Sequence, residues 1–213
     1  MKKAILIDID DCILNTIKRK KAIFEFLLNK KVPASEIIGK RTAEILSKYV
    51  SIEKVSEYRF KFWSIALCVD PIGEKFLYLD EPEPYARHIL RKLSKKYEIF
   101  YITNRLVSMQ KYTELTLKRY NFPKYWNIIS ADDYTFFKNE NGRKTIIKKL
   151  PSEYEYAVVV DDLPENYIYY KQIGIKNIIG YMKYIVLDEK LFYEHGASLV
   201  IKSWKEFPLK DFL

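Results

Sequence analysis

Cysteine and long apolar runs are scarce in this chain of 213 residues. Its two cysteines, Cys12 and Cys68, do not make a disulfide framework, which argues against a small secreted domain held together by disulfides. No apolar stretch is long enough to span a bilayer. The apolar run after Lys3 resembles the start of a signal peptide, but Asp8 interrupts it too early. We therefore expect a cytoplasmic protein without a membrane partner.

Negative charge is in deficit, because 37 lysines and arginines face 28 aspartates and glutamates, which gives a net charge of +9 at pH 7. A basic balance favours anionic partners such as phosphorylated metabolites, nucleic acid or acidic lipid headgroups. The lysines are spread along the chain without a long basic block, so nucleic-acid binding is not favoured. The hydrophobic share of 48% is ample for a packed core, which argues against a disordered chain.

An apolar run, Ala4 to Ile7, leads directly into the three carboxylates of Asp8, Asp10 and Asp11. A β-branched apolar run is typical of a buried strand in a parallel sheet. Because burying unpaired charge is costly, the strand must end at Asp8 and place the carboxylates at its carboxyl end, where open α/β sheets bind ligands. Carboxylates this close repel each other unless they share a cation or a proton. The plain alternative is a solvated acidic turn.

Two further apolar runs also end in polar residues. A second strand is predicted over 99–102 and ends at Thr103-Asn104-Arg105. A third is predicted over 157–160 and ends at Asp161 and Asp162. Segments with helical spacing separate these strands, and this alternation predicts parallel strands joined by right-handed crossovers. The predicted fold class is therefore α/β, a Rossmann-like parallel sheet flanked by helices, with a small all-helical cap.

The cap is predicted from a long segment of helical apolar spacing, 16–79, that separates the first strand from the second. Residues 1–15 and 80–213 would form the α/β catalytic core. Ahead of the last of the three strands, the sequence predicts a loop over 136–142, followed by a helix that begins at Lys144.

Four motifs in chain order resemble those of the haloacid dehalogenase superfamily of phosphotransferases. They are Asp8-Ile9-Asp10, Thr103-Asn104-Arg105, a lysine best matched by Lys144, and the acidic run Asp161-Asp162-Leu163-Pro164-Glu165-Asn166. Each motif alone is weakly specific, whereas all four in order, each after the expected element, are specific. The last motif is also weakly similar to that of the nucleotidase-like branch. The resemblance covers the core and leaves the helical segment unmatched in detail.

The resemblance implies a phosphomonoester hydrolase, a phosphatase that acts through an aspartyl-phosphate intermediate on a small phosphorylated metabolite or nucleotide. Asp8 would be the nucleophile. Asp10 would protonate the leaving oxygen and then deprotonate the attacking water. The implied cofactor is Mg²⁺, held by Asp8, by the backbone carbonyl of Asp10 and by Asp162, with Asp161 in support.

The same resemblance implies that Thr103, Asn104, Arg105 and Lys144 bind the substrate phosphate. Thr103 would donate its hydroxyl hydrogen bond, and Lys144 would pair with both the nucleophile and the phosphate, so both are also candidate catalytic residues. Plainer interpretations exist, since Thr103 could be a helix N-cap and Lys144 an exposed lysine at a helix start. Lys138 is a second candidate for the motif lysine.

Two positions depart from the family pattern, with Asp11 where Gly is frequent and Cys12 where Thr is frequent. They concern the geometry of the turn and remove no proposed catalytic carboxylate. The alternative functions are a phosphomutase or phosphonatase of the same fold, or a non-catalytic basic module that binds phosphate or nucleic acid. The substrate and the oligomeric state stay open.

Overall fold

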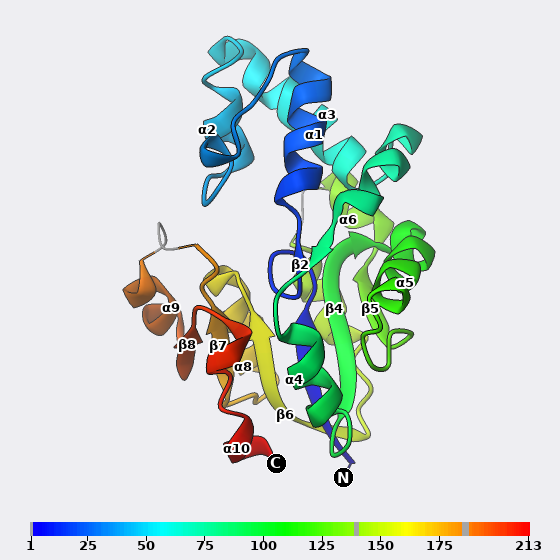
Figure 1. Ribbon diagram of the computed structural model, residues 1–213, viewed down its shortest axis with the longest axis vertical. Helices are drawn as coiled ribbons and strands as arrows, with labels where there is room; N and C mark the ends of the chain where they lie inside the picture. The colour runs from blue at the N-terminus through cyan, green and yellow to red at the C-terminus, as the bar shows by residue number, and fades with distance from the viewer. Residues whose placement is uncertain (1, 139–140, 185–187) are drawn as a thin grey trace. The chain divides into compact units, whose positions relative to one another are not determined.

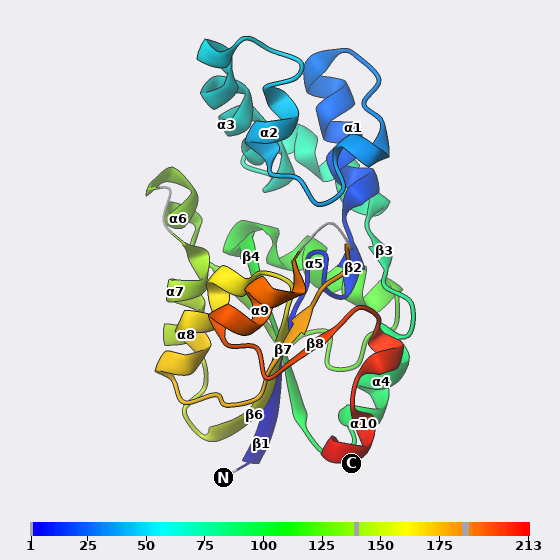
Figure 2. The same ribbon diagram turned by 90° about the vertical axis from the view of Figure 1, so that its left-hand side faces the viewer.

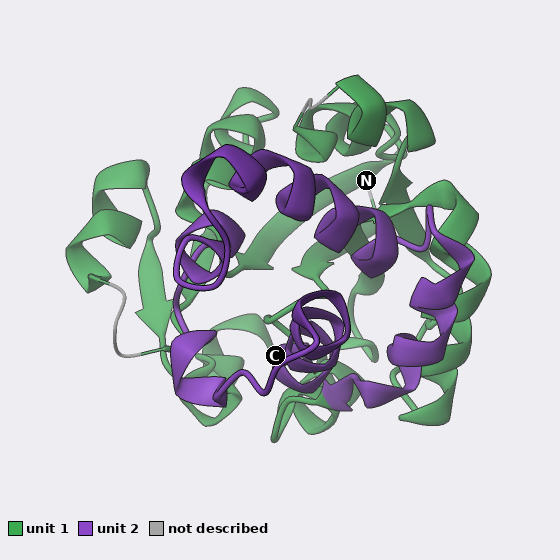
Figure 3. Ribbon diagram, turned by 90° about the horizontal axis from the view of Figure 1, so that it is seen from above, with its two compact units in different colours: residues 1–14, 82–213 green, residues 15–81 purple. Residues whose placement is uncertain are grey.

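A computed structural model describes residues 2–138, 141–184 and 188–213. The chain divides into two compact units, unit 1 with Met1–Leu14 and Pro82–Leu213, and unit 2 with Asn15–Glu81 (Figure 3). Two short strands, β2 (Leu14–Asn15) and β3 (Glu81–Pro82), stand in sequence at the two borders. No helix in the described ranges has both the length and the apolar character of a membrane span.

Unit 1 contains a six-stranded sheet in the order β5-β4-β1-β6-β7-β8 (Figure 1). The strands are β1 (Lys2–Asp8), β4 (Glu98–Leu106), β5 (Ile128–Ala131), β6 (Tyr154–Asp161), β7 (Ile178–Tyr181) and β8 (Leu199–Ile201). All neighbouring strands pair in parallel. The predicted fold class is confirmed, and the first predicted strand, which ends at Asp8, lies between β4 and β6.

Helices cover both faces of this sheet (Figure 2). One face packs against α4 (Ala86–Leu93), α5 (Gln110–Arg119) and α10 (Leu209–Phe212), and the other against α7 (Gly142–Lys148), α8 (Tyr167–Gln172) and α9 (Glu189–His195). Ile5 and Ile7 of β1 enter the first core, and Ala4 and Leu6 enter the second. Because successive side chains of a strand point to opposite faces, a strand covered on both sides must be apolar throughout.

Unit 2 is helical and has a core of its own. Its helices are α1 (Ile17–Leu28), α2 (Thr42–Leu46) and α3 (Val55–Ala66), with short 3₁₀ segments at Ala34–Glu36, Ile52–Lys54 and Pro71–Leu79. Phe24 of α1 stacks on Phe62 of α3 with ring centroids 4.4 Å apart, and Trp63 meets Phe62 edge-on at 5.3 Å. The aromatic residues at helical spacing therefore pack α1 against α3.

A buried ion pair joins the two ends of unit 2. Nε of Arg19, near the start of α1, lies 3.1 Å from Oδ1 of Asp80, with side chains 7% and 0% exposed. Removing one partner of such a pair leaves the other charge buried and costs about 3–5 kcal/mol. We therefore expect Asp80→Asn to destabilise unit 2 by that amount, measured as faster hydrogen exchange in peptides from α1 and α3.

The neighbouring pair between Lys18 and Glu81 supplies the matched control. Its charged atoms lie 2.6 Å apart, but the side chains are 63% and 49% exposed, and pairs of this kind contribute only about 0–1 kcal/mol. Glu81→Gln should therefore leave exchange nearly unchanged. The double variant Arg19→Met/Asp80→Leu should recover most of the loss, because it removes both buried charges. Exchange in Asp80→Asn as slow as in the original chain would contradict the expected contribution.

The second predicted strand does not end at Thr103, because β4 continues to Leu106. Thr103 pairs with Ser130 and Leu106 pairs with the next residue of β5, Ala131, so the two residues between Thr103 and Leu106 are extra. Such a bulge takes residues out of the ladder and turns their side chains, which lets a strand continue past polar positions. The sequence prediction was wrong here because it treated the first polar residue as the end of the strand.

The prediction of one loop over 136–142 was also wrong. Helix α6 (Asp133–Lys138) includes the first part of this segment, whereas residues 139–140 lie outside the described ranges. Helix α7 begins at Gly142, two residues before the predicted start. The reason is an N-cap, since the side chain of Asn141 accepts a hydrogen bond from the backbone N–H of Arg143 at 2.8 Å.

Candidate active site

Three adjacent strands bring the predicted motifs to one edge of the sheet. Asp8 ends β1, Thr103 lies in β4 and Asp161 ends β6. Asp8 pairs with Ile102 of β4, so Thr103 follows directly beside it. Because the strands are parallel, their carboxyl ends meet at the edge where α/β sheets bind ligands.

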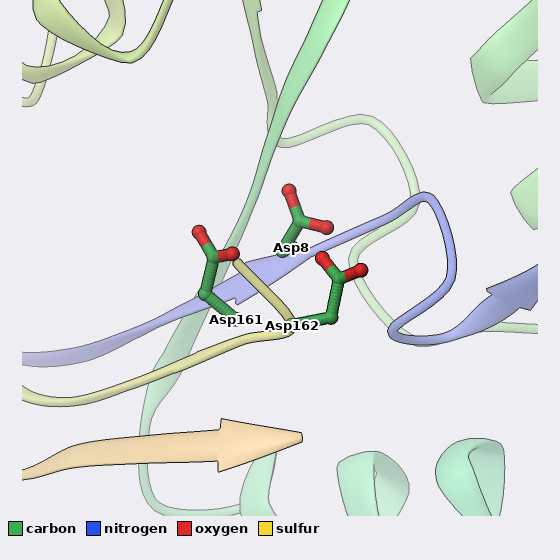
Figure 4. Close-up of side chains that lie close together, drawn as sticks. All are labelled: Asp8, Asp161 and Asp162. Carbon is green, nitrogen blue, oxygen red and sulfur yellow. The ribbon is translucent and has the colours of Figure 1, made fainter. Parts of the chain in front are cut away.

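The carboxylates of Asp8, Asp161 and Asp162 form a cluster in which one oxygen of each lies within 4.8 Å of the others (Figure 4). Asp8 and Asp161 are 4% and 0% exposed, and Asp162 is half-buried. Burial and the charge of Asp161 raise the pKa of the Asp8 carboxyl well above its ordinary value, although Arg143 opposes the shift. Buried carboxylates that repel each other in this way suit a hard divalent cation, because it would favour the ionised form of Asp8.

The Asp161 carboxylate is held by protein groups. It accepts hydrogen bonds from the backbone N–H of Leu163 at 2.9 Å, from Nδ2 of Asn166 at 3.1 and 3.2 Å, and from the hydroxyl of Tyr170. Burial raises the pKa of the Tyr170 hydroxyl, so this group stays a donor. These contacts fix Asp161 beside Asp8, and Asp162 follows directly after the end of β6.

The cation beside Asp8 is Arg143. Its Nη2 lies 2.6 Å from Oδ1 of Asp8 and 3.1 Å from Oδ2 of Asp161, and its side chain is 1% exposed. Burial alone lowers the pKa of the guanidinium, but Tyr170 and the two carboxylates more than reverse this and keep it charged. Within the described ranges, its Nε and Nη1 are buried without a hydrogen-bond partner.

The structure does not bring Lys144 to the cluster. Lys144 follows Arg143 in α7 and is exposed. Lys138, the second candidate, is also exposed, and its ammonium lies 5.2 Å from the ring centroid of Tyr134. The role of Lys144 stays a prediction, whereas the place expected for it next to Asp8 is taken by Arg143.

Helical periodicity was the signal that could have identified Arg143. Ile146, Ile147 and Leu150 follow it at i+3, i+4 and i+7, and these residues pack in the core between α7 and the sheet. A residue at position i of such a stripe faces the sheet, whereas its neighbour at i+1 points about 100° away. Tyr170 has the same signal, because it lies three residues after the buried Tyr167.

The residues of the second motif have different surroundings. Thr103 is fully buried inside β4, so it is not a helix N-cap, and its hydroxyl accepts a hydrogen bond from the backbone N–H of Arg105 at 3.1 Å. Asn104 is exposed. Arg105 is 1% exposed and binds the carboxylate of Asp10, with Nε and Nη2 at 2.9 and 2.7 Å from its two oxygens. The structure thus directs Arg105 to Asp10, although the sequence suggested a substrate contact.

The turn after β1 explains the first departure from the family pattern. Asp11 has φ 58°, a left-handed conformation that Gly adopts most easily and Asp tolerates. Its backbone N–H donates to the carbonyl of Leu14 at 2.7 Å, and its carboxylate lies 3.5 Å from the ammonium of Lys183. Cys12 is buried, and burial raises the pKa of its thiol, which disfavours the nucleophilic thiolate.

Comparisons with known proteins find similarity at the level of structure. No protein-family model matches the sequence, and curated proteins give no significant match. A candidate phosphatase from Clostridium difficile superposes with a TM-score of 0.72 at 15% identity, over 100% of this chain and 98% of that one. A haloacid dehalogenase family hydrolase from Deinococcus radiodurans, with bound phosphate and sodium, has a TM-score of 0.59 at 14% identity, over 96% and 93% of the two chains. A candidate hydrolase of the same type from Bacillus subtilis, bound to magnesium, has a TM-score of 0.60 at 14% identity, over 96% of each chain.

These similarities extend over almost the whole of each chain, although few residues are identical. The chain therefore has the fold of the haloacid dehalogenase superfamily, as the order of its four sequence motifs predicted. A fold alone does not define an activity, so the chemistry has to be argued from the residues of this site.

Proposed function

We propose that the protein is a Mg²⁺-dependent phosphomonoester hydrolase that acts on a small phosphorylated metabolite or nucleotide through an aspartyl-phosphate formed on Asp8. One observation carries this proposal: Asp8 lies at the carboxyl edge of the sheet between two further carboxylates and a buried arginine. A carboxylate can attack phosphorus and divide one difficult displacement into two easier ones.

In the first step, an oxygen of Asp8 would form a bond to phosphorus while the bond from phosphorus to the leaving oxygen breaks. Asp10 would give its proton to that leaving oxygen. In the second step, Asp10 would take a proton from water, and the water oxygen would replace Asp8 on phosphorus. Inorganic phosphate then leaves, and both aspartates return to their starting states.

Arg143 and Thr103 are the groups best placed to hold the phosphate. Arg143 has two buried guanidinium nitrogens, Nε and Nη1, without a hydrogen-bond partner in the described ranges, and buried donors of this kind are costly unless a ligand or water supplies an acceptor. Phosphate oxygens would be such acceptors, and guanidinium pairs with them well. We therefore assign to Arg143 the role that the sequence suggested for Lys144. The Thr103 hydroxyl accepts from the backbone N–H of Arg105 and lies 3.5 Å from Oδ2 of Asp10, a long contact that it would exchange for a phosphate oxygen.

The carboxylate cluster fits Mg²⁺ because all of its candidate ligands are oxygens and because burial and the charge of Asp161 raise the pKa of Asp8, a shift that a bound cation would oppose. Asp8, Asp162 and the backbone carbonyl of Asp10 would hold the ion, and Asp161 would support them. When bound, the ion would offset the negative charges of the carboxylates and the phosphate and so allow them to approach. Comparable proteins of the fold bind magnesium or phosphate.

Unit 2 is the proposed cap that selects the substrate, and it overlaps the segment 16–79 for which the sequence predicts a cap. The compactness and the separate core of unit 2 support this role. The amino-acid sequence of a unit with its own core can change without disturbing catalytic residues that lie in another unit. The compartment proposed is the reducing cytoplasm, because Cys12 and Cys68 are not joined in a disulfide and Cys12 lies in the turn beside the site.

The decisive test is hydrolysis of p-nitrophenyl phosphate and of a panel of sugar phosphates, nucleotides and small organic phosphates with and without Mg²⁺. We expect activity to fall by at least ~10³-fold in excess chelator and to return on adding Mg²⁺, since offsetting charge at the transition state contributes several kcal/mol. Undiminished activity in chelator would refute the metal requirement. Transfer of phosphate to a second hydroxyl instead of water would indicate a phosphomutase, and phosphate binding without turnover would indicate a binding module.

A further inference from the structure

We propose that Arg105 is the positioning residue of Asp10, which it holds so that one side of the carboxylate faces the reacting oxygen. The inference rests on the proposed function, because it assigns Asp10 the proton transfers. The sequence suggested that Arg105 binds the substrate, whereas in the structure Arg105 binds the carboxylate of Asp10.

The pairing has the geometry of a bidentate clamp. Nε of Arg105 lies 2.9 Å from Oδ2 of Asp10, and Nη2 lies 2.7 Å from Oδ1. Two parallel N–H···O bonds fix both the position and the plane of a carboxylate, which a single contact cannot do. A lysine at this position could supply the charge but not the planar fork.

Arg105 is more deeply buried than Asp10, so solvent and substrate would approach the Asp10 carboxylate from the side away from the guanidinium. The side chain of Arg105 is 1% exposed, whereas that of Asp10 is 30% exposed. Each carboxylate oxygen has two acceptor sites, and the guanidinium takes one site on each oxygen from the buried side. The hydroxyl of Thr103 also lies 3.5 Å from Oδ2 of Asp10. Because 30% of the Asp10 side chain is exposed, a leaving oxygen or a water would approach the carboxylate from its accessible side.

The bulge in β4 is what turns Arg105 toward Asp10. Arg105 is one of the two residues that drop out of the pairing with β5 between Thr103 and Leu106. The hydroxyl of Thr103 accepts the backbone N–H of Arg105 at 3.1 Å, which gives this N–H a partner outside the ladder. On the other side of the guanidinium, Nη1 lies 3.5 Å from Oγ1 of the buried Thr113 in α5. Thr103 would therefore serve two purposes, since it is also a proposed hydrogen-bond donor to the substrate phosphate.

A purely structural ion pair would have different consequences. It would raise or lower stability whatever the substrate, and its removal would slow all steps alike. A positioning residue acts through Asp10, so its loss should slow the steps that need proton transfer. It should also have no further effect once Asp10 can no longer transfer a proton.

The test measures the first turnover by rapid mixing with two aryl phosphates of similar shape. Phenyl phosphate has the poorer leaving group and needs the acid, whereas p-nitrophenyl phosphate needs it little. We expect Arg105→Met to slow phenol release by about 100-fold and nitrophenol release by much less, since general acid catalysis contributes roughly 10²–10⁴-fold. Arg105→Lys should recover part of the loss. In an Asp10→Asn background, Arg105→Met should cause no further loss.

Controls separate this inference from the proposed function and from misfolding. Arg119→Met makes the same change at an exposed arginine of α5 and should leave both rates unchanged. Thr113→Val removes the weak contact behind the guanidinium together with the hydrogen bond from the Thr113 hydroxyl to the carbonyl of Met109. It should reproduce the substrate dependence in milder form if Arg105→Met folds poorly. Equal slowing of both substrates, or an additive loss in the Asp10→Asn background, would overturn the inference while the phosphatase assignment stands. An original chain that hydrolyses neither phosphate would overturn both.

Discussion

Asp8→Asn should lower turnover by at least about 10⁴-fold, the scale seen when a nucleophile is removed. A neutral amide is a poor nucleophile, so no covalent phosphoenzyme should form. The variant should still fold. Burial and the charge of Asp161 raise the pKa of the Asp8 carboxyl, so its ionised form is disfavoured in the fold and a neutral amide avoids that cost. Acid quench and intact-mass spectrometry after mixing with p-nitrophenyl phosphate would show the absence of the phosphate adduct.

Asp10→Asn is the matched comparison, since it lies two residues away and makes the same chemical change. With p-nitrophenyl phosphate the first step should still proceed, because the leaving group departs without much help from an acid. The second step needs a base to activate water, which the amide cannot supply. We therefore expect one burst of nitrophenol followed by a stalled adduct on Asp8. Steady turnover near that of the original chain would place the acid and base elsewhere, with Asp11 as the next candidate.

Arg143→Ala should have the second largest effect. It removes the guanidinium that lies 2.6 Å from Asp8 and 3.1 Å from Asp161 and leaves both carboxylates buried together. Removing one partner from a buried ion pair costs about 3–5 kcal/mol of stability. Loss of the phosphate donors should lower turnover by a further ~10²–10³-fold, as for other donors at developing charge. Arg143→Lys should retain an intermediate rate, because charge remains without the fork.

The control is Lys144→Ala, one residue along the same helix. Lys144 is exposed, so its removal should change stability and turnover by no more than about twofold, as for other surface positions. Lys138→Ala should behave alike. Kinetics at saturating Mg²⁺ together with urea unfolding would separate the two effects of Arg143→Ala. A larger loss of turnover at Lys144 than at Arg143 would restore the assignment that the sequence suggested.

The strands could be predicted from the sequence because their signal is local. Ala4 to Ile7 is a continuous apolar run, and a carboxylate cannot continue inside a buried strand, so both the strand and its end follow from the residues themselves. The same reasoning placed Asp161 and Asp162 at the end of β6. Parallel pairing then brings these residues to one edge of the sheet, which the structure confirms.

The charge partners were not predicted by matching motifs, because they depend on geometry set elsewhere in the chain, although helical periodicity offered a signal for Arg143. Whether Arg143 or Lys144 faces Asp8 depends on where α7 begins, which is decided by the cap at Asn141. Whether Arg105 meets substrate or Asp10 depends on an irregular pairing of β4 with β5, and no periodicity in one strand reveals its register against another. A motif match also depends only on the type of a charged residue, and the type does not tell where its side chain points.

The ion pair at the ends of unit 2 has a consequence for the order of folding. Strand β1 pairs with β4, which lies beyond the whole of unit 2 in the chain, so the first contact between them must close a long loop. Folding of unit 2 draws Arg19 and Asp80 together. Only the segment between β1 and Arg19 and the segment between Asp80 and β4 then remain as the loop to be closed, which lowers the entropy cost of closure. In unit 1 these flanks also meet, since the backbone N–H of Glu83 donates to the carbonyl of Ile13 at 2.8 Å. A helical insertion whose ends are held together thus allows β1 and β4 to pair almost as if they were consecutive in the chain. Asp80→Asn should therefore slow the refolding of the sheet in unit 1, although both residues of the ion pair lie outside that unit.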